Sequence, residues 1–312
     1  GLSAWAQGTY RIQIMPGAAE MRYAKNLNDA IRFIGHPVFY HDGAYLYCDS
    51  AWLKEESNTV DCFGNVRIKS SDTLNLYGKF LHYDGNTKMA TLRDNVRLVD
   101  PQTTLTTDVM VFDRNTQIAS YVTGGKIVNK DNTLTSRKGF YHTDTKEMYF
   151  KEDVVLKNPD YKMNSDTLLY NTLSRKTFFL GPTMIRGKDN YMYCENGEYD
   201  RLTNKSRFSL NALLVDDNRR LTGDSLYYDR DNQYGKAVNN VVLTDTVQDI
   251  ILKGDYGEYW KSKGQAFITR QALAILGEKK DTLYLHADTL KALFDTAKQE
   301  TRELFAYHNA RF

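Results

Sequence analysis

Hydrophobic and polar positions along the chain repeat with a period of about 29 residues. An anchor residue, most often Tyr, recurs at intervals of 29 to 33 residues, and ten units cover almost the whole chain. The anchors are Tyr23, Leu53, Tyr83, Phe112, Tyr141, Tyr170, Tyr199, Tyr228, Tyr259 and Ala292. Repeats of this kind are typical of stacked architectures, in which length measures the number of units and not the number of domains.

The first half of each unit predicts a strand that bends. Apolar or small residues stand seven and five positions before the anchor, then two before it and at it, as in Leu76, Gly78, Leu81 and Tyr83. Residues two apart share one face of a strand, but the step from minus five to minus two is odd. A regular strand cannot keep both pairs on one face, so we expect a bend or bulge in its middle.

The second half of each unit predicts a turn and a second strand. The turn is rich in Asp, Asn, Thr and Gly, as in residues 84–87, and these residues tolerate turn dihedrals. Inward residues follow at plus seven, nine, thirteen and fifteen, with a polar corner at plus eleven and twelve that redirects the strand. Allowing a one-residue shift in the first unit and an insertion in the last, no inward position is Asp, Glu, Lys, Arg or His.

This pattern predicts an all-β fold: an elongated β-jelly-roll or β-solenoid of about ten two-strand repeats of ~29 residues, mostly antiparallel, around a continuous apolar interior. We expect a single domain over residues 7–312. Residues 1–6 are interpreted as a tag or signal-peptide remnant, because Ala4 and Ala6 fit a cleavage site; a frayed N-terminus is the alternative. The last unit reaches Phe312 without a polar cap, which indicates that the native chain continues or that the last strand awaits a partner strand.

The interior positions leave two interpretations open. One inward position is always small, and another alternates Leu or Met with Gly139, Gly197 and Gly257. In the first interpretation, the missing side chains leave an apolar slot suited to an acyl chain. In the second, the small residues let facing sheets approach closely, so that the interior is packed. The candidate lining residues of a lipid groove are Leu81, Tyr83, Leu92, Met110, Phe112, Tyr121, Phe150, Leu156, Leu168, Tyr170, Phe179, Ile185, Phe208, Leu226, Tyr228 and Leu243.

Composition and charge narrow the function. The formal net charge is +2 with 26% charged residues, which argues against a nucleic-acid binder held by a basic face. No run of 18 apolar residues predicts a membrane-spanning helix. Abundant Tyr and few Pro favour strands.

The sequence offers little catalytic chemistry. The six His residues show no metal spacing and are expected at the surface or in turns, and no nucleophile elbow, P-loop or dinucleotide fingerprint is present. A recurrent Asp at an outward position suits corners and turns better than the paired carboxylates of a polysaccharide-active enzyme. We therefore expect no enzyme, with no catalytic residues, no metal site and no cofactor. Cys48 and Cys62 are both inward; a disulfide and buried free thiols remain open alternatives.

The repeat motifs resemble a known family. Gly64-Asn65-Val66 after the second strand, echoed at 94–96 and 239–241, precedes a Leu-x-small-Asp-x-Leu-x-Tyr-Asp pattern. Together with the segment 41–51 they resemble OstA/LptA proteins, and more closely the longer OstA-like proteins of Bacteroidetes.

That resemblance implies a periplasmic β-jelly-roll in lipopolysaccharide transport and outer-membrane assembly. Its interior would shield the acyl chains of lipid A, and its edge strands would pair with other Lpt-type jelly-roll proteins or with a second copy. The alternative is a structural protein-interaction module with a packed interior.

Overall fold

The computed structural model describes residues 11–17, 20–24, 29–70, 74–101, 103–129, 132–188, 190–216, 219–277, 282–295, 297 and 301–312. The expected remnant at residues 1–6 lies outside them. The chain divides into two compact units, Gly1–Leu156 and Lys157–Phe312, which are described separately.

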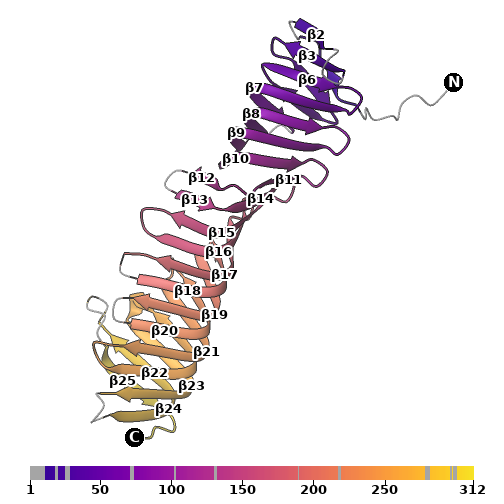
Figure 1. Ribbon diagram of the computed structural model, residues 1–312. Helices are drawn as coiled ribbons and strands as arrows, with labels where there is room; N and C mark the ends of the chain where they lie inside the picture. Colours follow the sequence, from indigo (N-terminus) through magenta and orange to yellow (C-terminus); the bar gives the residue numbers. More distant parts are fainter. Residues whose placement is uncertain are drawn as a thin grey trace, which may run out of the picture. The chain divides into compact units, whose positions relative to one another are not determined.

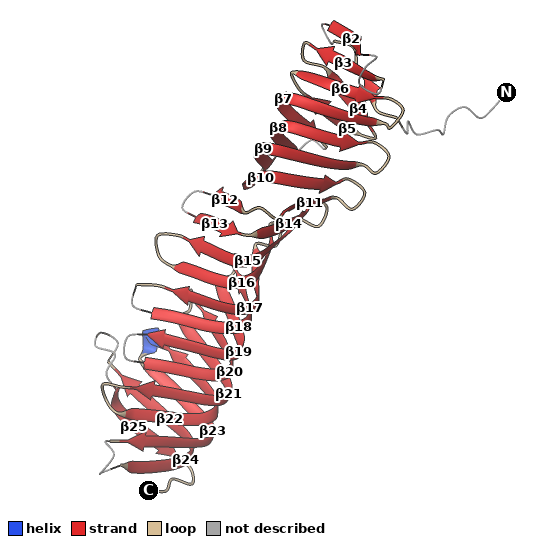
Figure 2. Cartoon of the chain, in the orientation of Figure 1, coloured by secondary structure: helices blue, strands red, loops and turns tan. Residues whose placement is uncertain are grey.

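Every strand pair described within each unit is antiparallel, and the strands are drawn in Figures 1 and 2. The first unit contains β1 (Gln13–Ile14), β2 (Glu20–Ala24), β3 (Ala30–Ile34), β4 (Val38–His41), β5 (Ala44–Tyr47), β6 (Ser50–Lys54), β7 (Thr59–Lys69), β8 (Asn75–Asp84), β9 (Met89–Asp100), β10 (Thr103–Asp113), β11 (Ile118–Tyr121), β12 (Gly125–Asn129), β13 (Asn132–Ser136), β14 (Lys138–His142) and β15 (Glu147–Lys157).

The second unit is built mainly from long strands. It contains β16 (Lys162–Asn171), β17 (Lys176–Arg186), β18 (Asn190–Asp200), β19 (Lys205–Asp216), β20 (Arg219–Asp229), β21 (Tyr234–Asp245), β22 (Ile250–Trp260), the 3₁₀ turn η1 (Lys261–Lys263), β23 (Gln265–Leu276), β24 (Leu283–Phe294) and β25 (Thr301–Tyr307). The prediction of an all-β, antiparallel fold is confirmed.

The bends that the sequence predicts are present. In the β8–β9 pair the register shifts between Tyr77 and Phe80, which is where the inward parity changes. The corner residues Asp94 and Asn95 both have positive φ, and so do Asn239 and Asn240 in the second unit. Asn and Asp tolerate this left-handed conformation better than other residues with a side chain. Each long strand therefore contributes to two arms that meet at a crease.

The recurrent outward Asp has a structural role at this crease. Asn65 donates a hydrogen bond from Nδ2 to Oδ2 of Asp49 at 2.8 Å, and Asn240 donates to both carboxylate oxygens of Asp224 at 3.1 and 3.2 Å. The Asp of one strand thus holds the corner Asn of the next. This contact accounts for the recurrence of both residues, as the assignment of the Asp to corners and turns predicts.

Asp side chains also stabilise the hairpin turns through hydrogen bonds. Asp84 accepts hydrogen bonds at Oδ1 from the backbone N–H groups of Asn86 and Thr87, at 2.8 and 3.2 Å. Asp113, Asp200 and Asp245 accept equivalent pairs. These Asx turns satisfy the turn backbone locally and allow short connections between long strands.

The first repeat departs from the pattern. Tyr23 on β2 is 62% exposed and Met21 is also exposed, so this anchor does not face a core. The anchor nevertheless keeps its column, because Tyr23 pairs with Ile31 and Ile31 pairs with Leu53, the next anchor.

Candidate functional site

The inward positions fall into two classes once the strands are bent. Positions at minus five, minus two, plus nine and plus thirteen lie beside the crease; we call them crease positions. Positions at minus seven, zero, plus seven and plus fifteen lie toward the ends of the arms; we call them lip positions. The pairing of Leu76 with Leu98 on one arm and of Tyr83 with Ala90 on the other defines this geometry.

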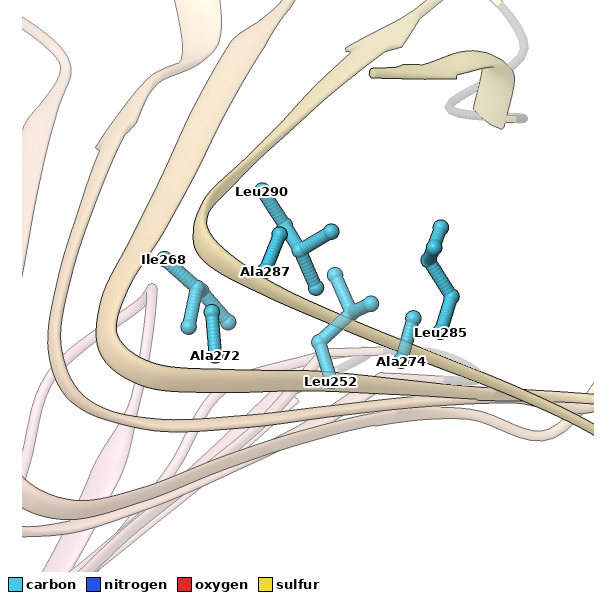
Figure 3. Packing of buried hydrophobic residues seen from close by; sticks show 7 residues of the cluster. All are labelled: Leu252, Ile268, Ala272, Ala274, Leu285, Ala287 and Leu290. Atoms are coloured by element: carbon cyan, nitrogen blue, oxygen red, sulfur yellow. The ribbon is translucent and has the colours of Figure 1, made fainter. Parts of the chain in front are cut away.

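Crease positions are filled with apolar side chains in both units. Figure 3 shows, near the end of the second unit, the crease residues Ile268, Ala272, Ala287 and Leu290 beside the lip residues Leu252, Ala274 and Leu285. The small residues allow the chain to turn sharply while the larger ones occupy the concave side.

Two glycines of the crease, Gly139 and Gly197, lie against neighbouring aromatic rings. A Cβ on Gly139 would meet the ring of Tyr121, and one on Gly197 would meet Phe179 at 3.0 Å and Phe208 at 3.2 Å. Aromatic rings thus fill the space that the missing side chains leave. At these two positions the interpretation that small residues permit close packing is supported, and that of an empty slot is not.

Lip positions are closed over most of the first unit. Leu76, Tyr83, Leu98 and Phe112 are all buried. A cavity of about 10 Å³ is lined by Leu98, Leu105, Met110, Ala119, Tyr121, Phe140, Tyr141, Met148 and Phe150. This volume holds about one water molecule and is too small for an acyl chain.

A polar network links the two arms of the first unit across the opening between their lip positions. We call this opening the mouth. His41, at the end of β4 on one arm, lies 2.7 Å through Nδ1 from the hydroxyl of Tyr83 on the other. Arg114 donates to that hydroxyl at 2.9 Å, to the His41 carbonyl at 3.1 Å and to the Asp42 carbonyl at 2.6 Å. Lys88 adds an ion pair to Asp42 at 2.5 Å. We call these five residues the latch.

The latch was not apparent in the repeat pattern. His41 is buried, so its assignment to the surface is wrong, and Arg114 sits in a turn outside the inward columns. The Arg114 guanidinium interacts with the Tyr83 hydroxyl, but burial is the larger influence and raises the pKa of Tyr83. A further tie across the mouth joins the Tyr141 hydroxyl to Asp100 Oδ2 at 2.8 Å.

Lip positions are more open in the second unit. Eight large apolar or aromatic side chains at lip positions between residues 170 and 243 are half-buried, and these are Tyr170, Ile185, Met192, Tyr199, Leu214, Leu221, Tyr228 and Leu243. Toward the end of the unit Leu252, Ala274, Leu285 and Ala292 are buried again. The partly exposed stretch is mainly apolar, with Thr177, Ser206 and Gly235 in the plus-seven column, and it is lined by the same columns that are buried over most of the first unit.

The candidate lining residues therefore separate into two groups. Eleven are buried: Leu81, Tyr83, Leu92, Met110, Phe112, Tyr121, Phe150, Leu168, Phe179, Phe208 and Leu226. Leu156 is a half-buried lip residue at the end of the first unit. The other four, Tyr170, Ile185, Tyr228 and Leu243, are half-buried lip residues of the second unit. Met192, Tyr199, Leu214 and Leu221 join them there; their columns are evident in the sequence, but their exposure is not.

Titratable and thiol groups add no reactive centre to this surface. Among the described residues, no group of three or more His, Cys, Asp or Glu side chains is placed to hold a metal ion. Cys48 and Cys62 are buried free thiols in contact with each other, and that contact together with burial raises the pKa of Cys62. Burial raises the pKa of Cys194 to about 11.

In the part of the chain that the structure covers, no helix has the length and apolar character needed to cross a membrane.

Comparison with known proteins finds a family match over part of the chain. Residues 14–166 match the model of the OstA-like protein family. No protein with curated annotation matches significantly. Among solved structures, the chain is similar to LptH of Pseudomonas aeruginosa, described as the LptA-homologous periplasmic component of the lipopolysaccharide transport device. Identity is 15%, the TM-score is 0.32, and the alignment covers 34% of this chain and 81% of LptH. The resemblance to OstA-like proteins is confirmed by the family match over residues 14–166.

Proposed function

We propose that this protein is a periplasmic component of lipopolysaccharide transport and outer-membrane assembly, and that it shelters acyl chains between the lips of its second unit. The OstA-like match over residues 14–166 supports the process. The row of half-buried apolar lip residues from Tyr170 to Leu243 supports the binding surface, and it is the single observation that carries it. In this proposal the protein carries its ligand and catalyses no reaction.

The chemistry of the lips suits an acyl chain. Leu, Ile and Met side chains offer apolar contact, and Tyr170, Tyr199 and Tyr228 place a ring with a polar tip at the mouth. Each CH₂ group removed from water contributes about 0.8 kcal/mol. Because the crease positions beneath are filled, binding requires the arms to separate at the lips and not at the crease.

Photo-crosslinking tests this proposal with matched positions. A photoreactive residue is placed at Leu243 or Tyr228 in the second unit, at Leu98 or Tyr83 in the same columns of the first unit, and at Asp166 on the outside. Purified lipopolysaccharide is then added and labelling is measured. We expect labelling at Leu243 and Tyr228 at least about tenfold above Asp166. Equal labelling at the lip and outward positions would contradict the carrier.

A packed interaction module remains the second candidate, and a specific observation favours it for the first unit. The lip and crease positions there are buried around a cavity of about 10 Å³, as a structural core requires. If neither Leu98 nor Leu243 is labelled while the protein stays folded, the result favours a packed protein-interaction module over a lipid carrier for the whole chain.

Pairing through edge strands is the proposed mode of assembly, with Lpt-type jelly-roll proteins or a second copy as partners. β2 pairs with β3, and its Met21 and Tyr23 side chains are exposed. An incoming strand would extend the sheet through backbone hydrogen bonds. Replacing Arg22 with Pro removes one backbone donor from β2. We expect it to weaken self-association or partner capture in light-scattering measurements, and unchanged association would exclude β2 as the edge.

A further inference from the structure

We infer that the outer face of one arm of the first unit binds a linear acidic glycan. This face carries a straight row of paired residues that runs across seven strands. The successive pairs are Tyr47 with Arg67, Arg67 with Tyr77, Tyr77 with Arg97, Arg97 with Thr106, Thr106 with Lys126 and Lys126 with Thr135. We call this set the cationic row.

The row alternates positive charges with rings or hydroxyl groups. The Arg67 guanidinium lies 5.4 Å from the ring of Tyr47, and that of Arg97 lies 5.1 Å from the ring of Tyr77. These cation–π contacts hold the two guanidinium groups over the sheet without neutralising them. Arg67 also donates from Nε to Oδ1 of Asn75 at 3.0 Å, a neutral partner.

Acidic side chains are absent from the outward positions beside the row on β5, β7, β8 and β9, between the crease and the lip. The parallel outward positions hold Tyr45, Lys69, Asn75 and Val99, which pair in register. The acids nearest to Arg97 on β9 are Asp94, at the crease, and Asp100, which is buried and accepts a hydrogen bond from Tyr141. Asp108 on β10 also lies at the crease. A net positive face on a chain of net charge +2 is complementary to an anionic partner.

A groove marks where the row accepts its ligand. It has a volume of about 490 Å³ and is lined by residues 95–97, 106–108 and 124–126. Arg97 and Lys126 are exposed on its walls, with the half-buried Thr106 between them. The groove therefore combines two cations, hydroxyl and backbone groups, and one acid at its end.

The geometry selects a linear polymer. Strands lie about 4.8 Å apart, so Arg67, Arg97 and Lys126, which are two strands apart in turn, repeat at roughly 9.6 Å along a straight line. A glycan with a carboxylate in each repeating unit presents charges at regular intervals, and its sugar rings stack on flat aromatic side chains such as Tyr47 and Tyr77. A lipid surface would favour an apolar wedge beside the cations, and a folded acidic protein has no need of a regular spacing.

Binding of the full chain to an oligogalacturonate tests the inference, with calorimetry at low and physiological salt as the readout. The variant R97Q/K126Q removes two charges from the row. The control R93Q/K151Q removes two charges from exposed outward positions on the other arm of the same unit. Charge-assisted hydrogen bonds are among the stronger ones, so we expect the row variant to bind about tenfold or more weakly and the control to stay within about twofold.

Three comparison probes make the result decisive: neutral dextran, polyglutamate and vesicles of anionic phospholipid. Preferential binding of the oligogalacturonate, lost in R97Q/K126Q alone, supports the inference. Equal weakening in both variants, absence of binding, or tighter binding of polyglutamate or vesicles overturns it. Circular dichroism confirms that both variants fold, and lipopolysaccharide crosslinking at Leu243 reports on the acyl-chain proposal separately.

Discussion

The two compact units use the same repeat but bury its lip positions to different extents. Leu98 pairs with Leu76 in the first unit, and Leu243 pairs with Leu221 in the second, in the same two columns. The first pair is completely buried, whereas the second is half-buried. Equivalent sequence positions thus serve as core in one unit and as accessible apolar surface in the other.

The latch explains much of this difference. In the first unit, Arg114 reaches across the mouth to the hairpin that contains His41 and Asp42, and Tyr83 completes the contact from the opposite arm. These polar groups shield the lip residues beneath them from water. The same bent strands therefore enclose a buried core where a separate hairpin covers the mouth. Where the lip positions are less covered, their apolar side chains stay accessible to solvent.

The largest expected effect comes from placing a charge at equivalent lip positions. Leu98→Asp buries a carboxylate without a partner, and we expect it to lower the free energy of unfolding by at least about 4 kcal/mol. Leu243→Asp leaves the carboxylate access to water and costs about 1–2 kcal/mol. Denaturant unfolding with hydrogen exchange resolved by unit measures both. Similar losses at the two positions would remove the distinction between closed and open lips.

The glycines of the crease provide the next comparison. Gly139→Ala forces the Tyr121 ring to move, and overpacking of this kind costs about 1–3 kcal/mol. At Gly257 in the second unit an added Cβ meets the Phe267 carbonyl oxygen at 3.4 Å, Val241 at 3.5 Å and Ile268 at 3.6 Å, which are ordinary contacts. We expect Gly257→Ala to change stability by less than about 0.5 kcal/mol in thermal unfolding, since Ala also restricts the unfolded chain.

A double-mutant cycle tests the cause of the Gly139 effect. Tyr121→Ala alone leaves a cavity and costs about 3–5 kcal/mol. If the ring is the obstacle, Gly139→Ala adds little further loss in the Tyr121→Ala background. Strictly additive losses would show that the glycine is required for another reason.

Removal of the latch should open the first unit. Arg114→Met keeps much of the side-chain length but leaves the Tyr83 hydroxyl and two backbone carbonyls without their donor, at a cost of about 2 kcal/mol. We also expect stronger binding of an apolar fluorescent dye, because the lips separate. Arg93→Met, at an exposed outward position, is the control. Unchanged stability and dye binding in Arg114→Met would mean that packing alone closes the mouth.

Local patterns in the sequence account for the strand architecture. The odd step between Gly78 and Leu81 predicts the register shift in β8, and Asp94-Asn95 predicts the corner in β9. These features arise from parity and turn chemistry within a few residues. The contact between the Tyr121 ring and Gly139 could also be predicted from the sequence, because Tyr121 stands in the crease column of the preceding repeat.

The closure of the mouth could not be predicted from the repeat. Arg114 contacts residues 72 and 73 positions away, so the interaction spans more than two periods and involves turn residues that vary from unit to unit. Leu98 and Leu243 are the same residue type in the same column, and no local property distinguishes them. Their exposure depends on what covers the lips, which is a tertiary property.

The smallest expected effect is at the outer corners, where the two units should behave alike. Asp49→Ala removes the acceptor of Asn65, and Asp224→Ala removes that of Asn240. Both corners are exposed, so each change should cost about 0.5–1 kcal/mol in denaturant unfolding. Asp166 faces the Gly181-Pro182 corner, which offers no Asn side chain, and Asp166→Ala should cost less than either. A difference above about 1 kcal/mol between Asp49→Ala and Asp224→Ala would show that the units differ at their creases as well as at their lips.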